Sequence, residues 1–485
     1  MRLLICLFIS LFMIGCGGSG GSNDSTNPST PSTPSNADAK GIYKGQSSNG
    51  IEFTILVTEN KIYAVTIDPL QPLIPADIGI GDYTVNGNNL TANDLVYFNY
   101  SEGFGTIDLS ATVSPNSSLN GSVTIGNVQT TFTSNFDSSY NNTASIDEIA
   151  GRSTGLSASQ ISGYESALLN INNQGIVSGT SYSGCSASGN ISPSTEGNYY
   201  NNQLTVTNCG ALSGENLTGV SLYDEDSNIL YTIAINDSQS SGFIYWGDVV
   251  RAINTDSIVN VPRGDSESQS NGEGLWYGTT ADNRTLMSLI TDEGESYVLY
   301  SGTNSNNLAG VVYGYVINTE AGFESIIARD FNLEGFGILD LDVSAVTTAD
   351  SSGISGTLNY DGSVNNFELN YDNTYELSAT TQQLIGTYIG NSFISVGSES
   401  ATVTIDSNGR FTGEGTSGCQ VQGVLEPRSR GNFFDMSITF RNNSCLYPNQ
   451  LFSGVLVFNA STNTIYAAAP NPNLTDGLLY IGTKQ

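Results

Sequence analysis

Two similar acidic elements are the residues of this chain whose types and spacing could do chemistry. Glu102 opens a Glu-Gly-Phe-Gly element that is followed by Asp108, and the same element recurs with Glu334 and Asp340. Two carboxylates held close together could transfer protons or bind a cation. A structural role is favoured, because Asp108 alternates with apolar neighbours as in a strand, and the glycines suit a turn from which Phe104 packs inward. We keep these four carboxylates as a candidate site.

The sequence contains no histidine. Histidine is the usual general base and the commonest metal ligand, so its absence argues against Ser-His-Asp and Cys-His catalysis and against zinc sites. We therefore expect no enzymatic activity, no metal and no cofactor. The catalytic alternative that stays open is an enzyme that acts on envelope glycans through carboxylates alone.

Two acidic segments could be taken for calcium loops, but hairpin turns are favoured. They are Asp224-Glu225-Asp226 and Asp406-Ser407-Asn408-Gly409. In the repeat described below, the first aligns with Asn459-Ala460-Ser461 and Asp406 aligns with Asn172, so the turns are kept while the carboxylates are not. The pair Tyr199-Tyr200 could stack on a ligand, but a place in the core is favoured.

The tripeptide Arg263-Gly264-Asp265 resembles the integrin-binding motif of animal matrix proteins. It lies in a linker between the two halves of the chain, where an adhesive motif would be exposed. The tripeptide would occur by chance in roughly one chain in ten of this length. We keep adhesion through this motif as an alternative.

Composition limits the possible partners. Asp and Glu total 46 against 14 Lys and Arg, which gives a net charge of −32. Such a surface repels nucleic-acid phosphates and anionic head groups, so we expect no nucleic-acid partner. Hydrophobic residues make up 38% of the chain, which is enough to fill real cores.

The first 16 residues resemble the signal peptide of bacterial lipoproteins. An apolar run, Leu3–Ile14, follows Arg2 and leads into Met13-Ile14-Gly15-Cys16, which is similar to a lipobox. The resemblance implies removal of residues 1–15, a lipid on Cys16 that anchors the chain to a membrane, and, with Gly17 next, sorting to the outer membrane. The following residues, to position 40, are rich in Gly, Ser, Pro and Thr and are predicted to form a disordered tether.

The rest of the chain is a tandem duplication. Gly41-Ile42-Tyr43-Lys44-Gly45 corresponds to Gly274-Leu275-Trp276-Tyr277-Gly278, and other segments recur at offsets between 232 and 236. Each half divides again, because Ala144–Gly155 matches Ala379–Gly390, which carries the same Gly-x-aromatic-x-Gly opening. This predicts module A1 at 41–143, B1 at 144–247, a linker at 248–273, A2 at 274–378 and B2 at 379–485.

Each module is predicted to be a small antiparallel β-barrel or sandwich, so the fold class is all-β. Apolar residues alternate with polar ones at Phe53, Ile55 and Val57, and turn residues separate such runs. Glu165–Leu169 could pass for a helix, but its repeat partner, Glu399–Val403, alternates as a strand, so we predict strands for both. Many short strands joined by hairpins favour closed barrels.

The repeat also selects a cysteine pairing. Cys185 and Cys209 occupy the same places in B1 as Cys419 and Cys445 in B2. Four cysteines allow three pairings, and the repeat favours one disulfide inside each B module. Each would stabilise its module by roughly 3–4 kcal/mol through loop closure.

The alternating layout of the modules is similar to that of two-lobed surface lipoproteins such as transferrin-binding protein B. The main hypothesis is a monomeric, non-enzymatic module, anchored to the outer membrane, that binds or adheres to an unidentified protein or glycan through loops at the barrel rims. The alternative is a lipocalin-like carrier that holds a small apolar ligand in a barrel lumen.

Overall fold

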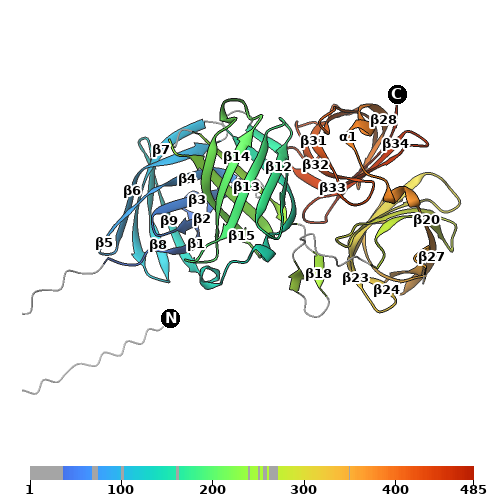
Figure 1. The fold of residues 1–485 in the computed structure, drawn as a ribbon, viewed down its shortest axis with the longest axis horizontal. Coiled ribbons are helices and arrows are strands. Elements are labelled where there is room, and N and C mark those ends of the chain that lie inside the picture. The colour runs from blue at the N-terminus through green and yellow to red at the C-terminus, as the bar shows by residue number, and fades with distance from the viewer. Residues whose placement is uncertain are drawn as a thin grey trace, which may run out of the picture.

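The structure is a computed structural model that describes residues 36–67, 75–99, 103–159, 163–238, 241–249, 252–254, 259–261, 271–348 and 350–485. Most of these residues lie in antiparallel strands that are wound into four barrels, so the predicted all-β fold is confirmed. The barrels form two lobes, which Figure 1 colours blue to green and yellow to red.

The first barrel belongs to module A1. Its strands are β1 (Gly41–Ser47), β2 (Glu52–Val57), β3 (Lys61–Ile67), β4 (Pro75–Asp82), β5 (Thr84–Asn86), β6 (Asn89–Asn99), β7 (Gly103–Ser114), β8 (Ser118–Ile125) and β9 (Val128–Asp137). β4 pairs with both β3 and β6, which closes eight strands into a barrel and leaves the short β5 attached to β6.

The second barrel belongs to module B1 and closes in chain order. Its strands are β10 (Gly151–Ser159), β11 (Gly163–Ile171), β12 (Ile176–Ser181), β13 (Ser186–Pro193), β14 (Tyr200–Thr207), β15 (Asn216–Asp224), β16 (Ile229–Asn236) and β17 (Gly242–Val249). The segment that we predicted as a linker also contains a hairpin, β18 (Ala252–Asn254) and β19 (Val259–Val261).

The third and fourth barrels repeat this arrangement. The A2 barrel consists of β20 (Gly274–Thr280), β21 (Thr285–Ile290), β22 (Glu295–Ser301), β23 (Leu308–Asn318), β24 (Gly322–Asn332), β25 (Gly337–Thr347), β26 (Gly353–Tyr360) and β27 (Ser363–Tyr371). The B2 barrel consists of β28 (Gly386–Ile394), β29 (Gly397–Ile405), β30 (Arg410–Gly415), β31 (Gln420–Pro427), β32 (Phe434–Phe440), β33 (Leu451–Asn459), β34 (Thr464–Pro470) and β35 (Gly477–Lys484).

Short helical turns connect the strands. They are η1 (Ser138–Asn141), η2 (Ile146–Glu148), η3 (Gly210–Leu212), η4 (Asn373–Glu376) and α1 (Thr381–Leu384). Among the helices of the described residues, none combines the length and the apolar character that crossing a membrane requires.

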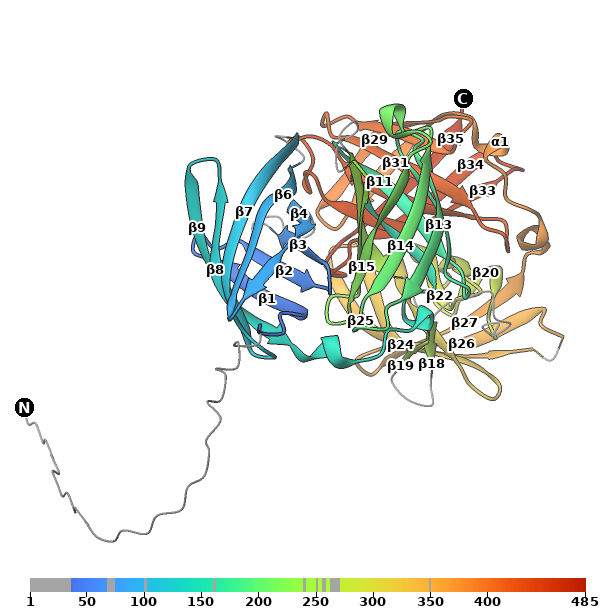
Figure 2. The same ribbon diagram turned by 60° about the vertical axis from the view of Figure 1, so that its left-hand side comes forward.

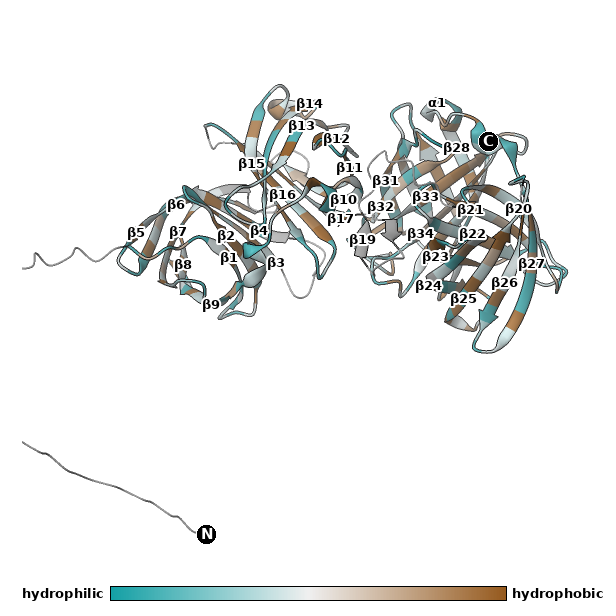
Figure 3. Cartoon of the chain, turned by 60° about the horizontal axis from the view of Figure 1, so that its bottom comes forward, coloured by the Kyte–Doolittle hydropathy of each residue, from teal (hydrophilic) through white to brown (hydrophobic). Residues whose placement is uncertain are grey.

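Alternation of apolar and polar residues builds the barrel walls. In β7, Ile107, Leu109, Ala111 and Val113 are buried while the residues between them are exposed. Successive side chains of a strand point to opposite faces, so these four fill the lumen. Figure 3 shows such apolar and polar bands along the strands. The ambiguous segment 165–169 lies in β11 and its partner in β29, so the prediction of strands there is confirmed.

Within each lobe, the two barrels pack wall against wall through apolar side chains. The seam of the first lobe joins Ile42, Leu56, Tyr63, Val65 and Ile80 of A1 to Leu156, Val220, Ile233, Ile244 and Trp246 of B1. The seam of the second joins Leu275, Met287, Tyr297, Val311 and Tyr313 of A2 to Phe433, Val455, Val457, Ala468 and Leu479 of B2. Burying so much apolar surface stabilises each lobe as one unit.

The contact between the lobes is mainly polar instead, although Leu451 of B2 packs against the apolar seam of the first lobe. The contact joins the two B barrels, where β11 lies against β31 and β32 (Figure 2). The hydroxyls of Ser166 and Thr439 are 2.6 Å apart across this contact, and Nη1 of Arg441 donates to the carbonyl oxygen of Tyr164 at 3.3 Å. Every residue of β32 is buried. The apolar residues Phe434, Met436, Ile438 and Phe440 face the lumen, and the polar residues between them face the other lobe.

A cluster of ion pairs lies at the junction of three barrels. Nη2 of Arg152, from B1, lies 2.5 Å from Oε2 of Glu293, in A2, and Nη1 of the same arginine pairs with Asp435 of B2. Arg428 of B2 pairs with Glu293 at 3.1 Å and also contacts Asp435 and Asp292. The side chain of Asp435 is only 2% exposed. Two scarce arginines therefore compensate buried carboxylates that would otherwise repel one another.

Candidate functional site

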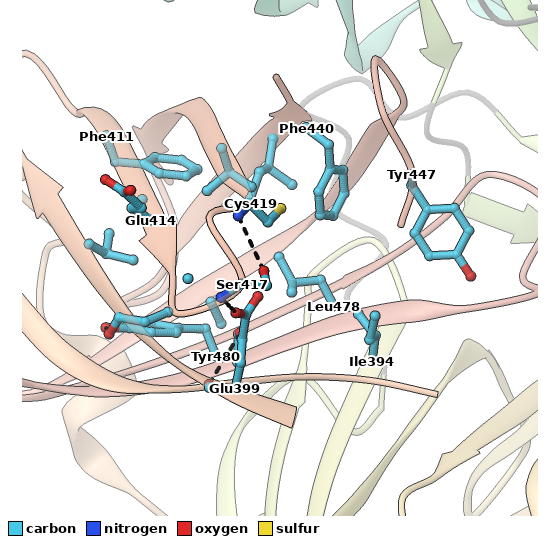
Figure 4. Close-up of a pocket in the computed structure, with 18 of the residues that line it drawn as sticks. Ile394, Glu399, Phe411, Glu414, Ser417, Cys419, Phe440, Tyr447, Leu478 and Tyr480 are labelled. Atoms are coloured by element: carbon cyan, nitrogen blue, oxygen red, sulfur yellow. Dashed lines mark hydrogen bonds between the residues drawn. The ribbon is translucent and has the colours of Figure 1, made fainter. Parts of the chain in front are cut away.

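A cavity of about 290 Å³ occupies the lumen of the B2 barrel. Its walls are inward-facing apolar side chains, drawn in part in Figure 4: Ile394, Ala401, Val403, Ile405, Phe411, Val421, Leu425, Met436, Ile438, Phe440, Leu456, Ile465, Ala467, Leu478 and Tyr480. Pockets that bind small molecules have volumes of about 300 Å³ or more and mainly apolar walls. The lumen of B2 is therefore the candidate binding site.

One end of this lumen is closed by packed side chains. At this end, Leu384 of α1 and Tyr388 of β28 are both fully buried in the barrel core. The hydroxyl of Tyr388 donates to the carbonyl oxygen of Leu384 at 2.8 Å, which ties the helix to the barrel wall. The cavity thus continues toward the end that carries the β28–β29 hairpin and the disulfide, and we call this end the mouth.

The matching barrel, B1, has a different interior. Three buried polar residues lie on neighbouring strands of this barrel. They are Asn202, the third residue of β14, Ser221, the sixth of β15, and Thr232, the fourth of β16. The amide of Asn202 donates to the hydroxyl of Ser221 at 3.2 Å, and the hydroxyls of Ser221 and Thr232 are 2.9 Å apart. These hydrogen bonds join polar side chains of three neighbouring strands on one side of the B1 lumen. The same positions of β32, β33 and β34 are Met436, Leu456 and Ala467, which make the lumen of B2 apolar.

The mouths of the two B barrels differ as well. In B1, Leu212 of η3 is 1% exposed and belongs to the barrel core, together with Phe243. In B2, the loop that follows the equivalent cysteine places Leu446 in solvent, with 52% of it exposed, and Leu478 replaces the phenylalanine. In place of the buried leucine of B1, this loop of B2 supplies Tyr447, which is only partly buried and packs against Phe440 and Phe452 at the side of the cavity.

A hydrogen-bond network holds the mouth of B2 in place. Asp476, which is fully buried, accepts hydrogen bonds from the backbone N–H of Ser395 at 2.9 Å and its hydroxyl at 2.8 Å, and from the hydroxyl of Tyr447. The Cys419–Cys445 disulfide ties the loop between β30 and β31 to the loop between β32 and β33, which also carries Tyr447. These bonds fasten the loops to one another at the rim, so the lumen is preformed.

The cysteines pair as the repeat predicted. Cys185 is bonded to Cys209, and Cys419 to Cys445. Each bond joins two loops at the same end of its barrel: those after β12 and β14 in B1, and those after β30 and β32 in B2.

Comparisons with known proteins find similar solved structures but no family. No protein-family model and no curated protein matches this sequence. Among solved structures, the chain is similar to transferrin-binding protein B. A double mutant of that vaccine antigen from Haemophilus parasuis is 10% identical, with a TM-score of 0.19 over 78% of this chain and 86% of that chain.

Two further structures of the same kind are similar. Intact Ap-TbpB, with its N and C lobes, is 10% identical, with a TM-score of 0.17 over 96% of this chain and 98% of that chain. The isotype 1 protein from serogroup B Neisseria meningitidis is 8% identical, with a TM-score of 0.18 over 76% of this chain and 84% of that chain. At these values we carry no residue role and no ligand over to this chain.

Among the described residues, the predicted A-module carboxylates do not come together in one site. Glu102 lies outside the described residues. Asp108 is exposed, and Oδ1 of this residue accepts a hydrogen bond from the backbone N–H of Asp94 at 3.0 Å. Glu334 pairs with Arg284 at 2.9 Å, and Asp340, 80% exposed, pairs with Arg329 at 2.6 Å. Each described carboxylate thus has a structural partner of its own.

Several other predicted sites have equally plain outcomes. Phe336, the repeat partner of Phe104, is 70% exposed, while the side chain of Phe104 is outside the described part. Asp224 lies at a hairpin end, where Oδ1 of its carboxylate is 3.0 Å from Nζ of Lys44. Within the described ranges, no group of three or more acidic or cysteine residues is arranged to hold a metal ion.

The remaining predictions concern tyrosines and terminal or linker motifs. Tyr199 and Tyr200 are 3% and 1% exposed, which confirms their favoured place in the core. Cys16 and the Arg263-Gly264-Asp265 tripeptide lie outside the described residues, so lipidation and adhesion stay predictions.

Sequence reasoning missed a buried carboxylate in A2. Asp330 is 2% exposed and accepts hydrogen bonds from the hydroxyls of Tyr300 at 2.7 Å and Tyr360 at 3.1 Å. Burial raises the pKa of Asp330 to about 6, although these hydrogen bonds and the nearby Arg284 lower it. The tyrosines satisfy this carboxylate inside the barrel, so we assign it to the core.

Replacing Asp330 by Asn is expected to flatten the pH dependence of stability. The folded chain keeps a proton on Asp330 up to about pH 6, whereas the unfolded chain loses it near pH 3.8. The stability contributed by this group is therefore complete below about pH 4 and is lost as the pH rises through about 6. Between pH 4 and 7, Asp330→Asn should gain roughly 2–3 kcal/mol relative to the parent protein.

Denaturant unfolding of both proteins across this pH range measures the difference. Asp340→Asn is the matched control, because its carboxyl is exposed on the same barrel. Parallel pH profiles for the parent and Asp330→Asn would contradict the prediction.

Proposed function

We propose that this chain is a lipid-anchored, non-enzymatic binding protein of the cell envelope that carries a small apolar ligand in the lumen of its B2 barrel. The observation that carries the proposal is the apolar cavity of about 290 Å³ in that lumen. The matching lumen of B1 instead carries hydrogen-bonded polar side chains on one side, and Leu212 is buried in its core.

Binding is favoured over catalysis by the chemistry of the lining. Most of the lining side chains are apolar and cannot transfer protons or attack a substrate, and the sequence supplies no histidine to do so. What such a wall offers a ligand is the removal of apolar surface from water, worth roughly 25 cal/mol per Å².

The anchor follows from the lipobox resemblance at Cys16. A lipid on that residue and the tether that follows it would hold the barrels near a membrane, with the outer membrane favoured. An anchored carrier would present its lumen to small molecules in the envelope without leaving the membrane surface.

The test uses the full chain with Cys16→Ser, exported without lipid and purified without detergent, because detergent would enter an apolar lumen. The probe is 1-aminonaphthalene, a dye that is small enough for this cavity, is uncharged at neutral pH and shifts its fluorescence to shorter wavelength when it leaves water. We expect saturable binding at one site. If a ligand co-purifies, native mass spectrometry should show it bound to the folded protein and absent after denaturation. If the dye shows no saturable signal and no ligand co-purifies, the proposed function is wrong.

A further inference from the structure

The mouth of the B2 lumen restricts which apolar molecules can bind. Building on the proposed function, we propose that the ligand is a single-chain amphiphile whose polar end donates hydrogen bonds and carries no negative charge. Size, charge and hydrogen-bonding capacity at the mouth support this assignment in turn.

The cavity volume sets the length of the apolar part. An apolar protein cavity of about 150 Å³ holds benzene, which has six carbon atoms. The cavity in B2, with about 290 Å³, is about twice that size. It therefore accommodates roughly a dozen non-hydrogen atoms, about the size of a ten-carbon chain with its polar end.

Charge at the mouth disfavours an anion. Glu399 lies on the inward-facing side of β29, in line with Ala401 and Val403, and it lines the cavity. The described lining includes no lysine and no arginine. An anionic head group would thus meet a carboxylate of the same charge, with no cation to compensate either of them.

Unused hydrogen-bonding capacity at the mouth favours a donor. Oε2 of Glu399 accepts the backbone N–H of Ser417 at 2.7 Å, which fixes the side chain (Figure 4). Its other oxygen, Oε1, accepts no hydrogen bond from the described residues. The side chains of Ser398 and Ser444 also line the cavity and are exposed. A hydroxyl or ammonium group can donate to these oxygens while its chain fills the lumen.

In B1, the matching glutamate has no such capacity. Oε1 of Glu165 accepts the hydroxyls of Ser181 at 2.7 Å and Ser183 at 2.9 Å, and Oε2 accepts the backbone N–H of Ser183 at 2.5 Å. This residue is 4% exposed. Both of its oxygens are in use, so the open acceptor belongs to the barrel that has the cavity.

Three probes of equal chain length test the assignment: 1-decanol, decylamine and decanoate, each used to displace the bound dye at pH 7.5. We expect 1-decanol and decylamine to bind at least tenfold more tightly than decanoate. Glu399→Gln keeps an acceptor for the N–H of Ser417 but removes the charge. It should therefore lower the ratio of the decylamine affinity to the decanoate affinity about tenfold. Glu165→Gln in B1 is the matched control and should leave the ratio unchanged.

The outcomes separate the two proposals. If the dye binds and decanoate competes as well as the other two, or better, the assignment of the ligand class is overturned while the proposed function stands. The same holds if none of the three displaces a bound dye. An unchanged ratio in Glu399→Gln overturns the role of that residue. Absence of both dye binding and co-purified ligand overturns the proposed function itself.

Discussion

Ala401→Trp is expected to weaken binding of the uncharged dye at least a hundredfold without lowering the thermal stability of the protein. Ala401 lies on the inward-facing side of β29 and lines the cavity, with part of its surface exposed to the lumen. An indole placed there would occupy space that the ligand needs, and it would fill a void instead of displacing packed neighbours. Dye titration and thermal unfolding of the full chain measure both effects.

The same substitution in the packed barrel is the control. Ala167 occupies the matching position of β11, is 3% exposed and belongs to the B1 core. Extra volume in a filled core forces its neighbours apart, so Ala167→Trp should cost about 1–3 kcal/mol and leave dye binding unchanged. If Ala401→Trp binds the dye as the parent does, the dye site is not the B2 lumen.

The second large effect is expected where the lobes meet. Arg152→Ala removes the cation that lies 2.5 Å from Glu293 and pairs with Asp435, whose side chain is 2% exposed. Removing one partner of a buried pair leaves uncompensated charge, which costs about 3–5 kcal/mol. Because the other contacts between the lobes are mainly polar, we expect this cost to separate the lobes, and small-angle X-ray scattering should show a larger radius of gyration.

An exposed pair supplies the comparison. Arg329→Ala breaks the contact with Asp340, which is 80% exposed, and surface pairs of this kind contribute about 0–1 kcal/mol. Its scattering profile should match that of the parent protein. Equal profiles for Arg152→Ala and the parent would show that the ion cluster does not hold the lobes together.

Local patterns in the sequence predicted much of the fold. Alternation along β7 or β29 depends on neighbouring residues alone, because successive side chains of a strand point to opposite faces. The repeat added what local patterns lack, since it turned the ambiguous segment 165–169 into a strand and selected one cysteine pairing of three. These inferences hold because duplicated segments fold alike.

The candidate carboxylates illustrate why spacing along one strand is a poor guide to a site. Glu334 and Asp340 recur with the spacing of Glu102 and Asp108, yet the described members point to separate partners at the surface. The buried carboxylate of A2 is Asp330 instead, and the tyrosines that satisfy it come from other strands. Residues distant in the sequence decide which carboxylate is removed from water.

The sequence alone determined a repeated, all-β chain with paired cysteines, because each of these depends on local periodicity or on comparison of the two halves. Whether a barrel is packed or hollow depends on the volumes of inward side chains from eight strands, and a hollow barrel shows the same alternation as a filled one. One signal was present: the polar residues Asn202, Ser221 and Thr232 are replaced by apolar ones in B2. Only the tertiary structure placed these residues side by side in one lumen and showed the space left beside their replacements.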